Sequence, residues 1–252
     1  MKKVEVFPVT SLPIIKEGDD LAYLICDAAE KQGTPIQNGD VIVATHVIVS
    51  RAEGAVVDLE TIEPSEFAKN IAKTADKDPR LVEVVLRSSK TIVRMQKGKL
   101  ITESKQGIVC ANSGIDQSNV PGNTIVALLP EDADKSAQQI RKRVHELTGK
   151  DIAVIVSDTH GRPLRHGEIN IALGTSGFTP LRDRRGEKDL FGYKIRIKRT
   201  AIADELASAA ELVIGQTDEG IPVAIIRGYD YPKSETAKAT IMTRAPEEDL
   251  FI

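Results

Sequence analysis

The chain has 252 residues, of which 41% are hydrophobic and 28% charged, and these proportions are ordinary for a globular protein with a substantial core. Its 34 basic and 37 acidic residues nearly cancel, so no global field favours nucleic acid or an anionic membrane as a partner. No apolar stretch approaches the ~20 residues that a transmembrane helix needs. The two cysteines, Cys26 and Cys110, lie in apolar settings and are predicted to be free thiols of a cytoplasmic protein.

The first half of the chain carries helical signals in three places. Acids at positions 17–20 precede an apolar stripe at helical spacing, and prolines begin the other two segments. The predicted helices cover residues 21–33, 64–72 and 79–88. Between the first two, the β-branched run 41–49 predicts a strand, and residues 91–110 are expected to alternate short strands with turns.

The second half of the chain predicts two more helices and two more strands. An apolar stripe predicts a helix over residues 133–147, and an alanine-rich segment predicts another over 201–212. Apolar runs predict strands at 152–157 and 223–228. Because helices and strands do not alternate regularly, an α+β fold is favoured over a doubly wound sheet. We expect mixed, mostly antiparallel sheets with flanking helices, in a single domain over residues 1–252, with two subdomains as the alternative.

The most informative segment begins with the strand predicted at 152–157. Asp158 and Thr159 stand at its end, and Arg162 and Arg165 follow after a glycine turn. Carboxylate and hydroxyl oxygens suit a hard divalent cation, and arginines suit the phosphates that such a cation accompanies. This segment therefore predicts one part of a metal–phosphate site.

A second predicted strand leads to Asp116, and Asn119 follows three residues later. Taken alone, an aspartate at such a place is more commonly a turn-forming or helix-capping residue. Two acids at separate strand ends nevertheless indicate a shared cation. Gln216 stands between Gly215 and Gly220, which either let the backbone approach a ligand or only shape the turn into the last predicted strand.

Common nucleotide and metal motifs are absent from the sequence. It contains no G-x-x-x-x-G-K-[ST] loop, no G-x-G-x-x-G after a strand, and no Cys/His cluster with zinc spacing. His160 and His166 flank the arginine loop, where a histidine is more commonly structural or surface-exposed than catalytic. The residues alone thus predict an enzyme that binds Mg²⁺ or Mn²⁺ with a phosphorylated ligand through an uncommon phosphate site.

With these motifs the chain resembles the coenzyme F-420-0:L-glutamate γ-glutamyl ligase family over nearly its full length. Several motifs occur in one order, and this order is more specific than any single motif. The motifs are Leu12-Pro13-Ile14-Ile15, Gly18-Asp19-Asp20-Leu21, Gly39-Asp40-Val41, Ser50-Arg51-Ala52-Glu53-Gly54, Asn112-Ser113-Gly114-Ile115-Asp116, Ser157-Asp158-Thr159, Gly161-Arg162-Pro163 and Ala203-Asp204-Glu205-Leu206-Ala207.

The resemblance implies a GTP-dependent ligase that adds L-glutamate through a γ-linkage to coenzyme F-420-0, a deazaflavin acceptor. In such an enzyme GTP phosphorylates the acceptor carboxylate to an acyl phosphate, the glutamate amine displaces phosphate, and GDP leaves. The resemblance also implies two Mg²⁺ or Mn²⁺ ions, K⁺ as a helper ion, and an intertwined homodimer of an unusual, family-specific α+β fold.

By position, the resemblance implies that Asp116 and Asp158 bind one divalent ion and that Thr159 and Gln216 bind the second. It also implies a set of GTP contacts. These are Leu12, Pro13, Ile14, Ile15, His46, Val47, Arg51, Asn119, Ile214, Gly215, Gln216, Thr217, Asp218, Glu219, Gly220 and Ile221. Arg162 and Arg165 are candidates from the residues themselves, as catalytic groups that hold phosphate or the acceptor carboxylate.

Two positions depart from the family pattern. Arg51 stands where lysine is usual, which keeps the charge but changes its geometry, and Gln216 supplies a neutral oxygen where glutamate is expected. Two alternatives to the first hypothesis therefore stay open. One is the same ligase chemistry on another acceptor such as a folate, and the other is a nucleotide-binding protein without activity, which Gln216 favours.

Overall fold

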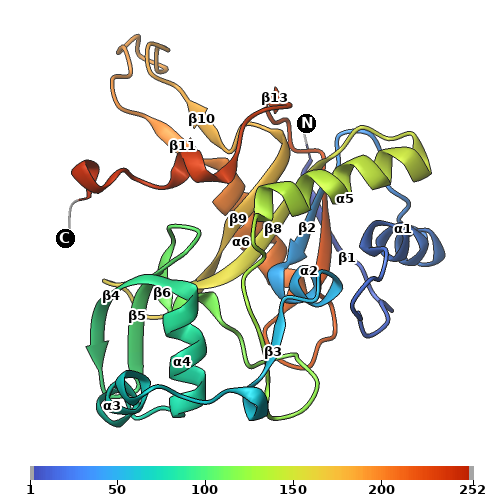
Figure 1. Ribbon diagram of the computed structural model, residues 1–252. Helices are drawn as coiled ribbons and strands as arrows, with labels where there is room; N and C mark the ends of the chain where they lie inside the picture. The colour runs from blue at the N-terminus through green and yellow to red at the C-terminus, as the bar shows by residue number, and fades with distance from the viewer. Residues whose placement is uncertain (1–2, 250–252) are drawn as a thin grey trace.

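The structure is a computed structural model that describes residues 3–249, and its centre is a six-stranded mixed sheet (Figure 1). In spatial order the strands are β1 (Glu5–Pro8), β12 (Val223–Arg227), β2 (Val41–Thr45), β8 (Ala153–Gly161), β9 (Glu168–Phe178) and β13 (Lys233–Ser234). In this sheet β2 and β8 run parallel, and the other neighbouring pairs are antiparallel. The predicted α+β class with mostly antiparallel sheets is confirmed.

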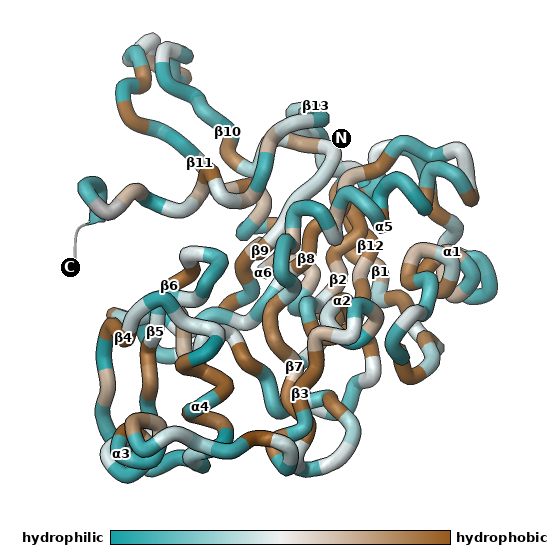
Figure 2. Tube along the Cα trace, viewed as in Figure 1, coloured by the Kyte–Doolittle hydropathy of each residue, from teal (hydrophilic) through white to brown (hydrophobic). Residues whose placement is uncertain are grey.

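Helices cover both faces of the central sheet. They are α1 (Leu21–Lys31), α2 (His46–Ala52), α5 (Ala133–Thr148) and α6 (Ile202–Ile214). In β2, Ile42 and Ala44 pack with α1 and α5, whereas Val41 and Val43 pack with α6. This alternation follows from the two-residue period of a strand. Because both faces are covered, the central strands are continuous apolar runs, which Figure 2 shows as brown segments.

The helix signals in the sequence correspond to caps in the structure. The Asp20 side chain accepts from the Tyr23 amide at the start of α1, and Asp132 accepts from the Lys135 amide at the start of α5. Gly149 ends α5 in the left-handed conformation, with a φ of 68°. The five predicted helices are thus confirmed, with ends within a few residues of those expected.

A second lobe lies below the central sheet in Figure 1 and has its own apolar cluster. Its elements are α3 (Glu66–Ala75), α4 (Pro79–Ser88), β4 (Ser89–Gln96), β5 (Lys99–Ser104) and β6 (Val109–Ala111). The short pair β3 (Val56–Asp58) and β7 (Ile125–Ala127) connects this lobe to the sheet. Short 3₁₀ turns lie at Leu59–Thr61, Asn112–Gly114, Ala239–Met242 and Pro246–Glu248. The strands and turns expected at 91–110 are confirmed.

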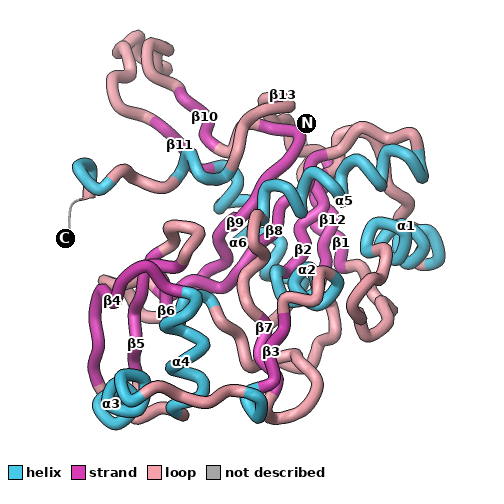
Figure 3. Tube along the Cα trace, viewed as in Figure 1, coloured by secondary structure: helices cyan, strands magenta, loops and turns pink. Residues whose placement is uncertain are grey.

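A hairpin arm projects from the other end of the molecule (Figure 1). Its base is the antiparallel pair β10 (Leu181–Asp183) and β11 (Arg199–Ala201). Figure 3 draws most of the chain between these strands as loop, and Leu190, Phe191 and Ile197 in it are at least 90% exposed. No apolar partner within residues 3–249 covers these three side chains.

The strand predicted at 41–49 is wrong in its second half. β2 ends at Thr45, and residues 46–52 form α2. Val47, Ile48 and Val49 are buried in this helix. The helix propensity of a β-branched residue is lower than that of alanine by less than ~0.7 kcal/mol, whereas burying such a side chain contributes about 1.5–3 kcal/mol. Tertiary burial therefore outweighs local propensity.

Other strands differ from the prediction in extent or were not predicted. β8 continues to Gly161, so Asp158 and Thr159 lie inside the strand where they pair with β9, rather than at its end. β9 and β1 were not predicted, and β13 follows the strand that we expected to be the last. Among residues 3–249, none of the helices combines the length and the apolarity needed to cross a bilayer. The single-domain organisation stays a prediction.

Candidate functional site

A cleft of about 400 Å³ opens at the end of β2, beside the outer half of β8. Five parts of the chain contribute most of its lining: the segment 12–15 after β1, the β2–α2 junction, the loop after residue 115, the outer half of β8, and the loop between α6 and β12. The Thr45 amide donates to the Pro222 carbonyl at 3.0 Å, which ties the end of β2 to the start of β12. The volume is typical of a small-molecule site.

The cleft brings together most of the residues that the resemblance implied. The implied metal ligands Asp116, Asp158, Thr159 and Gln216 all line it. The implied GTP contacts that line it are Leu12, Pro13, Ile14, Ile15, His46, Val47, Arg51, Asn119, Ile214, Gly215, Gln216, Thr217, Glu219, Gly220 and Ile221. Asp218 does not line it. The roles of these residues stay predictions, although their meeting in one cavity is what a shared ligand requires.

Backbone amides of nearby residues hold the carboxylates of the two aspartates in place. Asp116 exchanges backbone hydrogen bonds of 3.0 and 2.8 Å with Ala127, and its carboxylate accepts from the Ser118 amide at 2.6 Å. Asp158 lies in β8, and its Oδ1 accepts from the Thr159 amide at 2.7 Å. Both carboxylates are therefore fixed by short local contacts.

Both carboxylates act on one buried imidazole. His46 begins α2, is 1% exposed, and places Nε2 3.3 Å from Asp158 Oδ1. This separation suits an ion pair, but neither ring nitrogen has an aligned hydrogen-bond partner within residues 3–249. Burial lowers the pKa of His46, but the charges of Asp158 and then Asp116 outweigh burial and hold the pKa above its ordinary value. Burial thus favours the neutral ring, whereas the two acids favour the protonated one.

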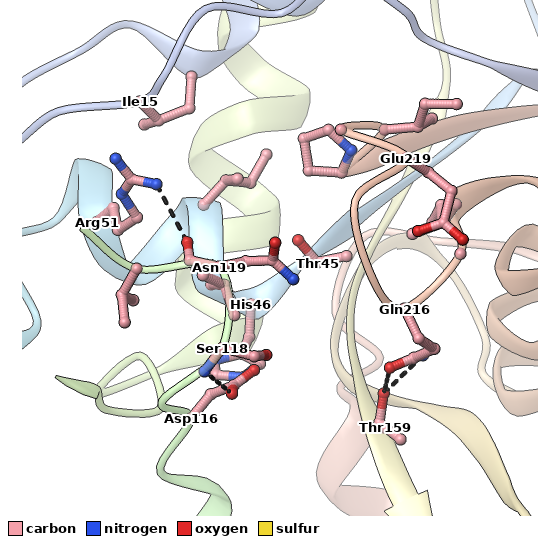
Figure 4. A pocket seen from close by; sticks show the side chains of 18 of the residues that line it. Ile15, Thr45, His46, Arg51, Asp116, Ser118, Asn119, Thr159, Gln216 and Glu219 are labelled. Atoms are coloured by element: carbon pink, nitrogen blue, oxygen red, sulfur yellow. Dashed lines mark hydrogen bonds between the residues drawn. The ribbon is translucent and has the colours of Figure 1, made fainter. Parts of the chain in front are cut away.

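A second polar group lies across the cleft, where Figure 4 shows Thr159 and Gln216 in contact. Thr159 Oγ1 lies 3.1 Å from Asn170 Oδ1 and 3.1 Å from Gln216 Oε1. Glu211 accepts from the amide nitrogens of both Asn170 and Gln216. Burial raises the pKa of Glu211, and the charge of Glu219 raises it further, against the hydrogen bond from Gln216.

Asn170 and Glu211 line the cleft but were missed by the sequence interpretation. Asn170 lies in β9, which was itself not predicted, so its inward-facing position was not visible. Glu211 looked like an ordinary charged residue near the end of a predicted helix. In the sequence Asn170 alternates with Ile169 and Ile171, so periodicity places it on the polar face of a strand and does not reveal its burial.

The loop between α6 and β12 folds over the cleft because of one glycine. Gly215 has a φ of 75°, and a Cβ atom there would lie 2.2 Å from the Glu219 carboxylate carbon. The Glu219 carboxylate accepts from the Thr217 amide at 2.7 Å. Gly215 therefore permits the close turn that brings Gln216 to Thr159.

Arg51 supplies a permanent positive charge to the cleft. It extends from α2, and its Nη1 donates to the Asn119 carbonyl at 3.3 Å (Figure 4). Burial lowers the pKa of Arg51, as expected for a guanidinium partly withdrawn from water. Arginine and lysine side chains other than Arg51 do not line the cleft within residues 3–249. This arrangement suits binding of an anionic group.

Arg162 and Arg165 are placed outside the cleft. Arg162 donates to the Gly167 carbonyl at 3.1 Å and to the His166 carbonyl at 2.5 Å, so its guanidinium closes the turn between β8 and β9. Arg165 is exposed on the same turn. The structure does not bring these two candidates to the aspartates. Cys26 and Cys110 are free thiols as predicted, and burial raises the pKa of Cys110 to about 12.

The cleft residues fit hard divalent cations by the chemistry of their donor atoms. Within the described chain, no three His, Cys, Asp or Glu side chains cluster as a metal site. The implied ligands are two carboxylates, a hydroxyl and an amide, all oxygen donors, which Mg²⁺ and Mn²⁺ prefer to nitrogen and sulfur. Mg²⁺ sites commonly combine one or two carboxylates with waters and substrate phosphates. The donor set is therefore adequate.

Comparison with known proteins agrees with this geometry. The family model described as F420-0:Gamma-glutamyl ligase matches residues 10–228. The coenzyme F420:L-glutamate ligase of Methanopyrus kandleri is 46% identical over 252 residues, which is 98% of this chain and 97% of that protein. The ligase of the same name from Methanocaldococcus jannaschii is 46% identical over 99% of this chain and 97% of its own length. That of Methanothermobacter thermautotrophicus is 46% identical over 90% of each chain.

The fold and the oxygen-lined cleft thus belong to a ligase, an enzyme of coenzyme F420 biosynthesis. The chain is a member of the F420-0:gamma-glutamyl ligase family. The match includes every segment that lines the cleft, because these segments all lie between residues 12 and 222.

Proposed function

We propose that this protein is a GTP-dependent ligase that joins L-glutamate to coenzyme F420-0 through a γ-linkage and releases GDP and phosphate. The observation that supports it most is the cleft, in which Asp116, the Asp158–Thr159 segment of β8 and the Gln216 loop meet beside Arg51. Family membership supports the acceptor and the amino acid, because the relatives carry both in their name.

The reaction that we propose has two steps. A carboxylate oxygen of the acceptor attacks the γ-phosphorus of GTP, the bond to the β-phosphate oxygen breaks, and GDP leaves. The amine of glutamate then attacks the acyl carbon, phosphate leaves with the acyl oxygen, and the amine loses a proton to form the amide. A second round on the γ-carboxylate of the first glutamate extends the tail in the same way.

In this proposal the chain supplies position and charge. Asp116 and Asp158 would hold one Mg²⁺ or Mn²⁺, Thr159 and Gln216 would hold a second, and K⁺ would assist. Such ions neutralise the charge that develops on phosphate oxygens during phosphoryl transfer. Arg51 faces the same space and would bind a phosphate of GTP. His46 lies against Asp158 and restricts the orientation of its carboxylate.

A homodimer is the assembly that we propose. The arm between β10 and β11 carries Leu190, Phe191 and Ile197, each at least 90% exposed. Exposed apolar side chains gathered on one projection commonly mark a protein interface. Light scattering of the purified protein tests this, and the double substitution Leu190→Asp with Phe191→Asp is expected to give a monomer. A monomeric wild-type protein would contradict the dimer.

Mass spectrometry tests the function directly. The protein is incubated with coenzyme F420-0, GTP, Mn²⁺ and L-glutamate, and the expected product is heavier by one or two glutamyl residues. Omitting Mn²⁺ or GTP should abolish the product, and ATP in place of GTP tests the nucleotide. Turnover with a folate and none with F420-0 would mean that the acceptor is a folate.

A nucleotide-binding protein without activity is the second candidate, favoured by the neutral side chain of Gln216. It predicts GTP affinity without phosphate release at any Mn²⁺ concentration, with either acceptor. Acceptor-dependent GDP release measured in the same reactions distinguishes the two candidates.

A further inference from the structure

Two side chains next to the implied second cation have no role in the reaction as proposed. Asn170 lies in β9 and is 2% exposed, and Glu211 lies in the last turns of α6. Both line the cleft and contact Thr159 or Gln216, which are the implied ligands. Their hydrogen bonds form one connected network. Its direction is the order of donors and acceptors along it.

Glu211 sets that direction, because both of its carboxylate oxygens lie against amide nitrogens, and an amide nitrogen only donates hydrogen bonds. Its Oε2 accepts from Asn170 Nδ2 at 2.5 Å, and its Oε1 accepts from Gln216 Nε2. Each amide must therefore turn its nitrogen toward Glu211 and its oxygen away. One carboxylate thus decides the orientation of two amides that rotate by half a turn at little cost by themselves.

The orientation of Asn170 in turn decides that of the Thr159 hydroxyl. Thr159 Oγ1 donates to Asn170 Oδ1 at 3.1 Å, and a hydroxyl has one hydrogen to donate. Gln216 places Oε1 3.1 Å and Nε2 2.9 Å from the same oxygen. With its hydrogen directed to Asn170, Thr159 keeps a lone pair for a ligand in the cleft.

We propose that Glu211, acting through Asn170, is a positioning residue for the second divalent cation of this enzyme. Through its hydrogen bonds it orients the oxygens of Thr159 and Gln216 so that they can bind the cation. This inference rests on the proposed function, which requires that cation. Groups that orient metal ligands from behind in this way are general features of metal sites.

Glu211→Gln tests the inference with little change of shape. The new amide has one accepting oxygen and one donating nitrogen, so it no longer accepts from both Asn170 and Gln216. In GTP-bound protein titrated with Mn²⁺ and followed by electron paramagnetic resonance, the weaker site is expected to lose about 10–100-fold in affinity. The Mn²⁺ concentration for half-maximal turnover should rise by the same factor, with turnover recovering at saturating Mn²⁺.

A compensating pair separates orientation from simple damage. In the double variant Glu211→Gln with Asn170→Asp, the new amide at 211 donates to the new carboxylate at 170 and still accepts from Gln216. The carboxylate at 170 also still accepts from Thr159. This variant is expected to regain most of the lost Mn²⁺ affinity. Glu205→Gln, an exposed residue of the same helix outside the cleft, is the matched control and should bind Mn²⁺ as the wild-type protein does.

Three results would overturn the inference. The first is a Glu211→Gln variant that binds both Mn²⁺ ions with wild-type affinity. The second is a double variant as weak as the single one, and this comparison with wild type still decides the matter if the single variant fails to fold. The third is a wild-type protein that binds no second Mn²⁺ and forms no glutamylated product, and that result alone would also remove the proposed function.

Discussion

The cleft and the α3–α4 lobe both bury polar side chains, but the hydrogen bonding of these side chains differs between the two regions. In the lobe, Ser113 Oγ lies 2.6 Å from Ser89 Oγ and 2.7 Å from Thr102 Oγ1, so these hydroxyls satisfy one another. At the cleft, both ring nitrogens of His46 and the Ser157 hydroxyl are buried without a hydrogen-bond partner among residues 3–249. Buried polar atoms without a hydrogen-bond partner are therefore more numerous at the cleft than in the lobe.

This difference separates hydroxyls that stabilise the fold by pairing from buried polar atoms that gather beside the cleft. A buried polar atom without a partner costs about 1–3 kcal/mol, so a protein tolerates several in one place only where something else compensates. Three of the five such atoms within the described chain belong to residues that line the cleft. A fourth, Asn112 Oδ1, lies outside the cleft, in the same turn of the lobe as Ser113. The comparison predicts opposite effects of mutations in the two regions.

Asp158→Ala should have the largest effect on activity. Removing a carboxylate from the implied cation site forfeits several kcal/mol of charge stabilisation, which corresponds to a loss of about 10³-fold or more in turnover. The measurement is GDP release over a range of Mn²⁺ concentrations, with thermal unfolding to verify the fold. Asp27→Ala, a half-buried aspartate of α1 outside the cleft, is the control. Turnover within tenfold of wild type would remove Asp158 from the site.

Arg51→Ala should raise the KM for GTP by about 10–100-fold, because a charge-assisted hydrogen bond contributes roughly 1.5–3 kcal/mol. Arg51→Lys keeps the charge and should give a smaller increase. Initial rates at several GTP concentrations and saturating Mn²⁺ measure both variants. An unchanged KM in Arg51→Ala would mean that this side chain does not contact the nucleotide.

Thr102→Val tests the lobe in the opposite sense. The substitution keeps the shape of a fully buried side chain and removes the hydroxyl that pairs with Ser113. The free energy of unfolding should fall by about 0.5–1.5 kcal/mol, because Ser113 loses one hydroxyl partner and keeps the other, Ser89. Turnover per folded molecule should stay at the wild-type level. Urea denaturation measures the stability, and GDP release measures the activity. A loss of activity without a loss of stability would mean that the lobe contributes to catalysis.

The smallest expected effect is on the pH dependence of stability in the metal-free protein. Burial lowers the pKa of His46, but Asp158 and Asp116 hold it above the unfolded value of about 6.5. Such a group adds stability that is fully present below the unfolded pKa and is lost as pH rises through the folded pKa.

The excess stability of wild type over His46→Gln should therefore shrink as pH is raised above about 6.5. Urea denaturation at a series of pH values, with a chelator present, measures it. A stability difference that grows with pH in this window would contradict the buried ion pair.

The helices show how far local signals reach. α1, α3 and α4 were predicted from acids or a proline at the start of the segment, α5 from an apolar stripe and α6 from an alanine-rich segment, and the structure contains all five. Within the candidate site, the two aspartates, Thr159 and Gln216 were identified as residues, and the structure brings them into one cleft. Their ligand roles stay predictions. Asn170 and Glu211 were not identified, because their environment is created by β9 and α6 together.

The amino-acid sequence by itself determined the ends of the helices, the apolar central strands and the family, because caps, periodicity and ordered motifs are local properties of the chain. The tertiary structure alone decided that residues 46–49 continue as a helix, since burial against the sheet outweighed their β propensity. It also decided that Arg162 faces its own turn and that Glu211 meets Gln216, because these contacts depend on where distant segments pack.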